Sequence, residues 1–259
     1  GLMGENGAGK STLIKVLTGV EEFETGEIRV DGIEGNVVNR SPQEAQKRGI
    51  STVYQEINLC PNLTVAENLF IGREPRKGGF IDWKEMNRRS AKLLEELDIH
   101  ADVTKTIDNY SIAIQQMIAI ARAVDVDAKV LILDEPTSSL DEEETQRLFA
   151  VVRKLKAQGL GVIFVSHFLD QIYELCDRIT VLRNGELPRV ELISKMIGKE
   201  LGDIQSMGKN TALCGDEVLI EADGLSAFGR IQDFDLQIHR GEVVGFAGLL
   251  GSGRTETAE

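Results

Sequence analysis

The two ends of the chain carry the same glycine-rich pattern. Residues 1–15 read GLMGENGAGKSTLIK and residues 245–259 read GFAGLLGSGRTETAE, and the two segments align without a gap. The matched positions are Gly1 with Gly245, Gly4 with Gly248, Gly7 with Gly251, Gly9 with Gly253, Lys10 with Arg254, and Ser11 with Thr255. Such a repeat indicates two copies of one structural unit in tandem. We therefore expect one full period of the tandem, truncated at both ends.

Composition and charge narrow the class of protein. The 259 residues are 42% hydrophobic, and the longest apolar runs, such as Val130–Leu133, have the length of strands rather than membrane spans. Three cysteines without metal-site spacing favour a reducing, cytosolic compartment. The net charge is −13, and basic runs are short, such as Arg73–Lys77. Because nucleic-acid binding neutralises phosphates with cations, this balance predicts that the chain binds no nucleic acid.

Strands and helices alternate along most of the chain. Hydrophobic periodicity and capping signals predict helices over residues 9–18, 42–49, 83–97 and 142–158, and strands over residues 27–30, 50–54, 130–133, 162–165 and 178–183. Residues 61–123 have a helical texture, with capping-box spacing at Thr64 and Glu67. The alternation predicts an α/β fold with a mainly parallel sheet and a helical subdomain at about 61–123.

A change of texture separates two units. Residues 204–216 lose all periodicity and indicate a linker between a first domain, 1–203, and the truncated start of a second, 217–259. The second unit has strand-like segments at 218–222, 234–238 and 243–247. Residues 217–247 correspond, by the repeat, to strands expected ahead of Gly1. They either pair with the first domain in place of those strands or remain a loosely attached stub, and the cost of open strand edges favours pairing of some kind.

The first glycine pattern fits the phosphate-binding consensus G-x(4)-G-K-[ST]. Its glycines let backbone N–H groups turn toward phosphate oxygens, and the following helix adds the positive end of its dipole. Lys10 is suited to reach the β- and γ-phosphates, and the Ser11 hydroxyl is suited to bind Mg²⁺. The alternative is a glycine-rich turn with a solvated lysine. The candidate nucleotide-binding residues are Gly4, Glu5, Asn6, Gly7, Ala8, Gly9, Lys10, Ser11 and Thr12.

An acidic pair follows the apolar run Val130–Leu133. A strand that ends in Asp134 delivers a carboxylate to the sheet edge, where it can hold Mg²⁺. Glu135 can polarise an attacking water, and Pro136 stops the strand. Taken alone, two acidic residues after a strand more often form a solvated turn. Downstream of a phosphate-binding loop, they predict the metal and water side of the same site.

The order of these motifs resembles the ATP-binding-cassette (ABC) ATPases. The remaining family elements are Gln55 after a strand, Tyr110–Gln116, LILDEPTSSLD over 131–141, and Ser166-His167. The resemblance implies a P-loop NTPase of the ABC type that uses ATP and Mg²⁺.

The resemblance also implies roles for individual residues. Gln55 matches a glutamine that contacts Mg²⁺ and couples to a membrane partner, and His167 matches a histidine that touches the γ-phosphate. Ser111 matches the nucleotide-contacting serine of the signature motif, and Ser139–Asp141 match the D-loop. Without the resemblance, a histidine such as His167 would more often have a structural role, and Gln55 would indicate no function.

Several phrases are similar to the tandem ATPases of carbohydrate importers. They are Tyr54-Gln-Glu with Leu63-Thr-Val-Ala-Glu-Asn-Leu69, Ser-Ile-Ala-Ile-Gln-Gln-Met over 111–117, and GLLGSGRTE over 248–256. The resemblance implies an ATP-hydrolysing motor at the cytoplasmic face of the cell membrane. Its expected partners are membrane permease subunits, a sugar-binding protein reached through them, and the second nucleotide-binding domain of the same chain.

Two departures from the family pattern affect one composite site. The signature positions that carry two glycines and a glutamine in the family hold Ile112, Ala113 and Ile114 here. In the second loop, Arg254 stands where the first has Lys10, and a planar guanidinium does not reproduce the point charge of a lysine. In the family, one domain's loop faces the other domain's signature, so we expect the Lys10 site to carry most turnover.

Two other classes of function remain open at this point. A tandem ABC ATPase acting in translation or repair would need a basic surface, against which the net charge argues. A catalytically inert binding module would contain the same motifs without turnover. Low-salt nucleic-acid binding would favour the first alternative, and nucleotide binding without hydrolysis would favour the second.

Overall fold

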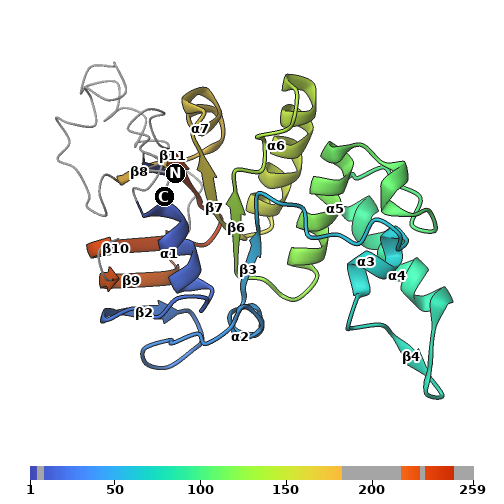
Figure 1. The fold of residues 1–259 in the computed structure, drawn as a ribbon, viewed down its shortest axis with the longest axis horizontal. Coiled ribbons are helices and arrows are strands. Elements are labelled where there is room, and N and C mark those ends of the chain that lie inside the picture. Colours follow the sequence, from blue (N-terminus) through green and yellow to red (C-terminus); the bar gives the residue numbers. More distant parts are fainter. Residues whose placement is uncertain (5–8, 183–216, 228–230, 248–259) are drawn as a thin grey trace, which may run out of the picture.

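A computed structural model describes residues 1–4, 9–182, 217–227 and 231–247 (Figure 1). Its helices are α1 (Lys10–Leu17), α2 (Pro42–Lys47), α3 (Val65–Phe70), α4 (Trp83–Glu96), the 3₁₀ turn η1 (Ile107–Asn109), α5 (Ile112–Val124), α6 (Glu142–Ala157) and α7 (Leu169–Leu175). Its strands are β1 (Leu2–Gly4), β2 (Thr25–Val30), β3 (Ile50–Val53), β4 (Arg76–Lys77), β5 (Phe80–Ile81), β6 (Val130–Asp134), β7 (Gly161–Ser166), β8 (Arg178–Leu182), β9 (Val218–Ala227), β10 (Ile231–His239) and β11 (Val243–Ala247).

A six-stranded parallel sheet forms the centre, in the order β1-β8-β11-β7-β6-β3. Strand β6 shows why its sequence is a continuous apolar run rather than an alternating one. Val130 and Ile132 pack into one hydrophobic core, whereas Leu131 and Leu133 pack into the other. Both faces of β6 are therefore covered, as is usual for a parallel strand. The predicted α/β fold with a mainly parallel sheet is confirmed.

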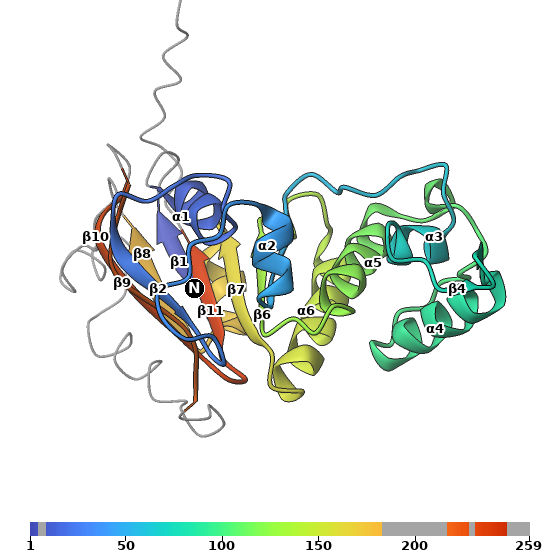
Figure 2. The same cartoon turned by 90° about the horizontal axis from the view of Figure 1, so that it is seen from below.

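Different elements cover the two faces of this sheet. On one face, Leu13 and Leu17 of α1 share a core with Ile28 of β2 and Ile220 of β9. On the other face, Phe149 of α6 packs edge-on against Phe164 of β7, with ring centroids 5.8 Å apart. Figures 1 and 2 both show β2, β9 and β10 at one end of the molecule and α3 and α4 at the other.

The strands from residue 217 onward are built into the sheets of the preceding residues. Strand β11 pairs in parallel with β7, β8 and β1, and β9 pairs antiparallel with β2. Leu2 lies opposite Phe246 and Met3 opposite Ala247, which are the residues that the internal repeat makes equivalent. Of the two packings left open by the sequence, the loosely attached stub is wrong for residues 217–227 and 231–247. The linker 204–216 lies outside the described residues, and the division at 203 and 217 stays a prediction.

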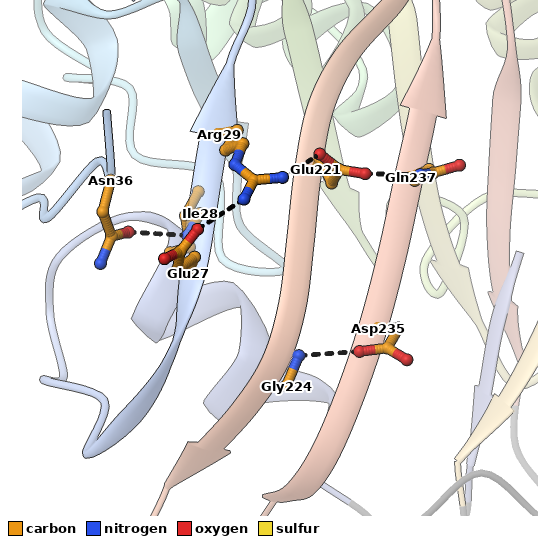
Figure 3. A network of polar contacts seen from close by, with 8 residues as sticks. All are labelled: Glu27, Ile28, Arg29, Asn36, Glu221, Gly224, Asp235 and Gln237. Atoms are coloured by element: carbon orange, nitrogen blue, oxygen red, sulfur yellow. Dashed lines mark hydrogen bonds and ion pairs between the residues drawn. The ribbon is translucent and has the colours of Figure 1, made fainter. Parts of the chain in front are cut away.

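Polar contacts reinforce this pairing at the surface and in the interior. Arg29 of β2 donates to Glu221 of β9 over 2.8 Å, and Gln237 of β10 donates to the same carboxylate over 2.6 Å (Figure 3). Exposed pairs of this kind contribute little individually. In the interior, the Glu242 carboxylate is 1% exposed and lies 3.1 Å from Arg178 of β8. The antiparallel sheet β10-β9-β2 is thus tied to the parallel sheet by a buried charge.

The helical segment departs from the sequence prediction in one place. The capping box at Thr64 is present, since the hydroxyl accepts from Glu67 N and the Glu67 carboxylate accepts from Thr64 N. Between α3 and α4, however, the chain forms the small hairpin β4–β5 instead of helix. Gly78 and Gly79 both have positive φ, 60° and 90°, which suits a two-residue hairpin turn. The predicted helical subdomain at about 61–123 thus contains α3, α4 and α5 and, between α3 and α4, a hairpin that the sequence did not predict.

Candidate functional site

Helix α1 begins with its backbone N–H groups open to an anion. Gly9 precedes it with φ 100°, a left-handed conformation that glycine adopts without strain. Among the described residues no side chain caps this helix, and its first turn contains no acidic residue. Lys10 is 8% exposed and Thr12 is buried, whereas Ser11 is exposed. Gly4 ends β1 nearby in sequence, and Glu5, Asn6, Gly7 and Ala8 lie outside the described residues. The described half of the predicted loop thus has the chemistry of a phosphate site.

Asp134 stands at the end of β6, where burial changes its acidity. Its pKa is raised from 3.8 to about 6, mainly by desolvation and also by the charge of Glu135, while the charge of Lys10 acts in the opposite direction. The influence of Lys10 means that the two residues share one electrostatic environment although they are far apart in sequence. A half-buried carboxylate that resists ionisation is well suited to bind a cation, because a metal ion replaces the proton.

Glu135 and His167 meet where β6 and β7 end. Glu135 has φ 47°, a sparsely populated conformation for a residue with a side chain, and its N–H donates to Val165 O over 2.9 Å. His167 Nδ1 lies 3.3 Å from Glu135 Oε1, and both side chains are about one-fifth exposed. The His167 ring also packs against Phe168, with centroids 4.1 Å apart. A carboxylate and an imidazole are therefore held together beside Asp134, as proton-transfer chemistry requires.

A hydrogen-bond bridge behind these residues was not predicted from sequence. Gln171 of α7 accepts, through Oε1, from Thr137 Oγ1 over 2.6 Å and from Ser166 Oγ over 3.3 Å. Ser166 in turn accepts from Phe168 N over 3.1 Å. Thr137 and Ser166 are 3% and 1% exposed. The bridge joins the turn after Glu135 to the turn that carries His167. Its members are up to 34 residues apart, so only the fold brings them together.

Of two further predicted residues, Gln55 follows β3 at the sheet edge where β6 ends in Asp134, because Val53 lies opposite Leu133, whereas Ser111 lies on another helix. Gln55 is exposed just after β3, beside a cavity of about 310 Å³ whose lining includes Tyr54, Glu56, Arg73 and Arg122. Ser111 is the exposed N-cap of α5, and its hydroxyl accepts from Ile114 N over 3.4 Å. Figures 1 and 2 both place α1 and α5 on opposite sides of β6 and β7.

The donor set fits Mg²⁺ held together with a nucleotide. Within the described ranges, no group of three or more His, Cys, Asp or Glu side chains could form a metal cage. Mg²⁺ is usually held by one or two carboxylates together with water and substrate phosphates. Asp134 supplies such a carboxylate, and the exposed Ser11 hydroxyl lies in the first turn of α1, next to Lys10. Arg254 and Thr255 of the second glycine pattern lie outside the described residues.

Comparison with known proteins identifies the family. The family model described as ABC transporter matches residues 1–138. The chain belongs to the ABC transporter family. Two solved ATP-binding cassettes have the same fold: MJ0796 in a dimeric post-hydrolysis state bound to ADP and Pi (TM-score 0.59, 27% identity, 73% of this chain and 82% of that one), and MJ1267 in its ADP conformation (TM-score 0.65, 25% identity, 80% and 85%).

Curated relatives of the chain are named for sugar import. The galactofuranose transporter ATP-binding protein YtfR of Escherichia coli K12 is 49% identical over 268 residues, covering 100% of this chain and 53% of that protein. The fructose import ATP-binding protein FruK of Bifidobacterium longum is 49% identical, covering 98% and 52%. The chain spans about half the length of the curated relatives it matches. In the described part of this ABC transporter family member, no helix is long and apolar enough to span a bilayer.

Proposed function

We propose that this chain is part of the ATP-hydrolysing motor subunit of an ABC-type sugar importer. One observation carries the proposal most directly. Lys10, Asp134, Glu135 and His167 come from three separate segments and converge where α1 begins and β6 and β7 end. The sugar-import names of relatives 49% identical over the chain support the substrate class.

Some of these residues bind the phosphates and the metal ion, and others act in proton transfer. The open N-terminus of α1 and Lys10 bind the phosphates, and Lys10 offsets charge that develops on the transferring group. Ser11, Gln55 and Asp134 hold Mg²⁺, which when bound neutralises phosphate charge. Glu135 orients and deprotonates the attacking water, and His167, 3.3 Å away, holds that carboxylate and contacts the γ-phosphate side.

The remaining predicted partners lie outside the chain's own hydrolytic cluster. The cavity beside Gln55 opens between β3 and the helical segment, which is a suitable place for a permease segment at the cytoplasmic face of the membrane. The exposed Ser111 is free to face a nucleotide held by another domain, including a second nucleotide-binding domain of the same protein. A sugar-binding protein would act through the permease.

Substitution of Lys10 tests the proposal. In the full-length importer assembly, Lys10→Ala should lose most ATP hydrolysis and Mg-dependent nucleotide binding, because the phosphate charge loses its counter-charge. Lys47→Ala, which removes an exposed lysine at the end of α2, serves as the matched control and should keep the parent rate. Parent-level hydrolysis by Lys10→Ala would show that the site is assigned wrongly. In the same assembly, Arg254→Ala should reduce hydrolysis only modestly if the two composite sites differ.

A further inference from the structure

The hairpin β4–β5 and the first residue of α4 expose large apolar side chains away from the hydrolytic cluster. Phe80 is 81% exposed, Trp83 52% and Ile81 36%. Figure 1 shows the hairpin projecting from the end of the molecule formed by α3 and α4. Three neighbouring apolar side chains on one projection are uncommon on a free protein surface and indicate an interaction site.

The same segment is basic in an acidic chain. Residues 73–89 contain six Lys and Arg against three Asp and Glu, whereas the whole chain has a net charge of −13. Some of these cations have partners: Arg73 pairs with Asp125, and Arg88 with Glu85. The others include Arg76, Lys77 and Lys84, all exposed, which form no ion pair within the part of the chain that the structure describes. The projection therefore carries a net positive charge.

The register of the hairpin places charge and apolar surface together. Arg76 lies opposite Ile81, and Lys77 lies opposite Phe80. Because side chains opposite each other share a face, each face of the hairpin carries one cation beside one apolar side chain. The glycine turn of Gly78 and Gly79 keeps the tip narrow.

We propose that this hairpin docks on an anionic lipid surface. Lysine and arginine near a bilayer are attracted by anionic headgroups, and tryptophan and phenylalanine favour the interface between headgroup and acyl chain. The combination on one projecting hairpin satisfies both requirements. The proposal concerns direct contact with lipid, independent of ATP chemistry and of any contact with a permease.

A lipid surface fits the hairpin better than a shaped protein pocket. The two cavities of about 310 Å³, beside Gln55 and beside Arg240, include no residue from 76 to 84. The contact surface projects from the molecule and consists of long, flexible cations and aromatic rings. Such a surface adapts to a fluid headgroup layer, whereas a peptide ligand would require a groove.

The chain provides its own reporter for this contact. Trp83 is the one tryptophan among the 259 residues, so its fluorescence reports on this site alone. The full chain is titrated with phosphatidylcholine vesicles, either pure or mixed with phosphatidylglycerol. We expect a blue shift of Trp83 emission and protection from acrylamide quenching with the mixed vesicles. Raising the salt concentration should reverse both effects, because headgroup attraction is screened.

Variants assign the contact to the hairpin. Each cation removed should weaken vesicle binding roughly fivefold, so Arg76→Gln with Lys77→Gln should weaken it about 25-fold. Phe80→Ser should reduce the blue shift while leaving the salt dependence. The matched controls are Lys47→Gln with Lys154→Gln, two exposed lysines elsewhere, and Val20→Ser, an apolar residue 52% exposed. Both controls should behave as the parent chain.

Three outcomes would overturn the proposal. The first is no change in Trp83 emission with anionic vesicles. The second is binding that the hairpin and control variants weaken equally, which would reflect non-specific adsorption. The third is a Trp83 response that appears only when the vesicles carry the permease, which would assign the hairpin to a protein partner instead.

Discussion

The N-termini of helices α1 and α5 differ in whether a side chain caps their backbone N–H groups. Helix α1 begins after Gly9 with no described side-chain cap and with Lys10 almost buried. Helix α5 begins with Ser111, whose own hydroxyl accepts from the backbone, and continues with Ile112, which is 51% exposed. One helix end offers its N–H groups to a ligand, and the other satisfies part of them internally.

The difference shows that a helix N-terminus becomes a ligand site only when charged side chains of other elements lie beside it. Around α1 lie the half-buried Asp134 at the end of β6 and the pair formed by Glu135 and His167. Around Ser111 the structure describes no comparable group of charges, and an exposed isoleucine follows it. The described part of the chain thus brings Lys10, Asp134, Glu135 and His167 together, whereas Ser111 lies on another helix.

The largest expected effect concerns Glu135, one of the charged residues beside α1. Glu135→Gln should lower ATP turnover by a factor on the order of 10²–10⁴, because a positioned general base is lost while the side-chain size is kept. Nucleotide should remain bound, since the phosphate contacts of α1 are unchanged. Single-turnover hydrolysis and retention of labelled ATP measure both. Glu142→Gln, an exposed carboxylate a few residues on, is the control. Parent-rate hydrolysis by Glu135→Gln would move the role to His167.

The next effect tests the bridge behind the cluster. Gln171→Leu should lower turnover roughly ten- to a hundredfold, because small displacements of reacting groups are costly. Gln171→Glu should restore most of it, since a carboxylate accepts from the Thr137 and Ser166 hydroxyls as the amide oxygen does. Gln146→Leu removes an exposed glutamine of α6 that donates to Glu174 of α7, and should behave as parent. If the leucine and glutamate variants are equally slow, the loss of turnover does not come from losing the hydrogen-bond acceptor Oε1 of Gln171.

A smaller effect concerns stability and pH. The folded-state pKa of Asp134, about 6, lies above the ordinary value of 3.8, so the folded chain holds an extra proton between roughly pH 4 and 6. Ionisation in that window therefore destabilises the fold as pH rises. Without nucleotide or divalent metal, Asp134→Asn should unfold at the same free energy as parent near pH 4. Above pH 6 it should be more stable by on the order of 1–3 kcal/mol. Denaturant titration across pH measures this, and a pH-independent difference would contradict it.

The smallest effect concerns Ser111 and tests whether the N-terminus of α5 differs in role from that of α1. Ser111→Ala should reduce unfolding free energy by about 1 kcal/mol, the usual contribution of a serine cap, and leave Mg-nucleotide binding by this chain unchanged. In the full importer it should lower turnover if Ser111 faces another domain's nucleotide. Weaker nucleotide binding by the chain alone would mean that α5 contributes to the Lys10 site after all.

Local rules in the sequence predicted most elements of the fold. The glycine pattern predicted helix α1, and the spacing of Thr64 and Glu67 predicted the start of α3. The apolar run ending in Asp134 predicted β6 and the place of the Asp134 carboxylate at the end of that strand. In each case the signal lies within a few residues, which is the range over which capping and periodicity act.

The parts that the sequence did not predict depend on contacts between distant residues. Gln171 meets Thr137 only because α7 follows β7 beside the end of β6. Helix α7 itself is seven residues long and carries no side-chain cap, so its signal was weak. The hairpin β4–β5 was missed because its two short strands interrupt a helical texture. The roles of Gln55 and Ser111 came from family resemblance, and they stay predictions.

The register between β1 and β11 bears on how the chain reaches its fold. Leu2 and Met3 lie beside their repeat equivalents, and both strands pair with β7 and β8. Two segments of one chain therefore suit overlapping positions in the same sheet, which adds a near-equivalent competitor to the folding landscape. Two copies of the chain can exchange such segments with little loss of backbone pairing, and this is the condition for domain-swapped dimers. The internal repeat thus makes concentration a variable in refolding.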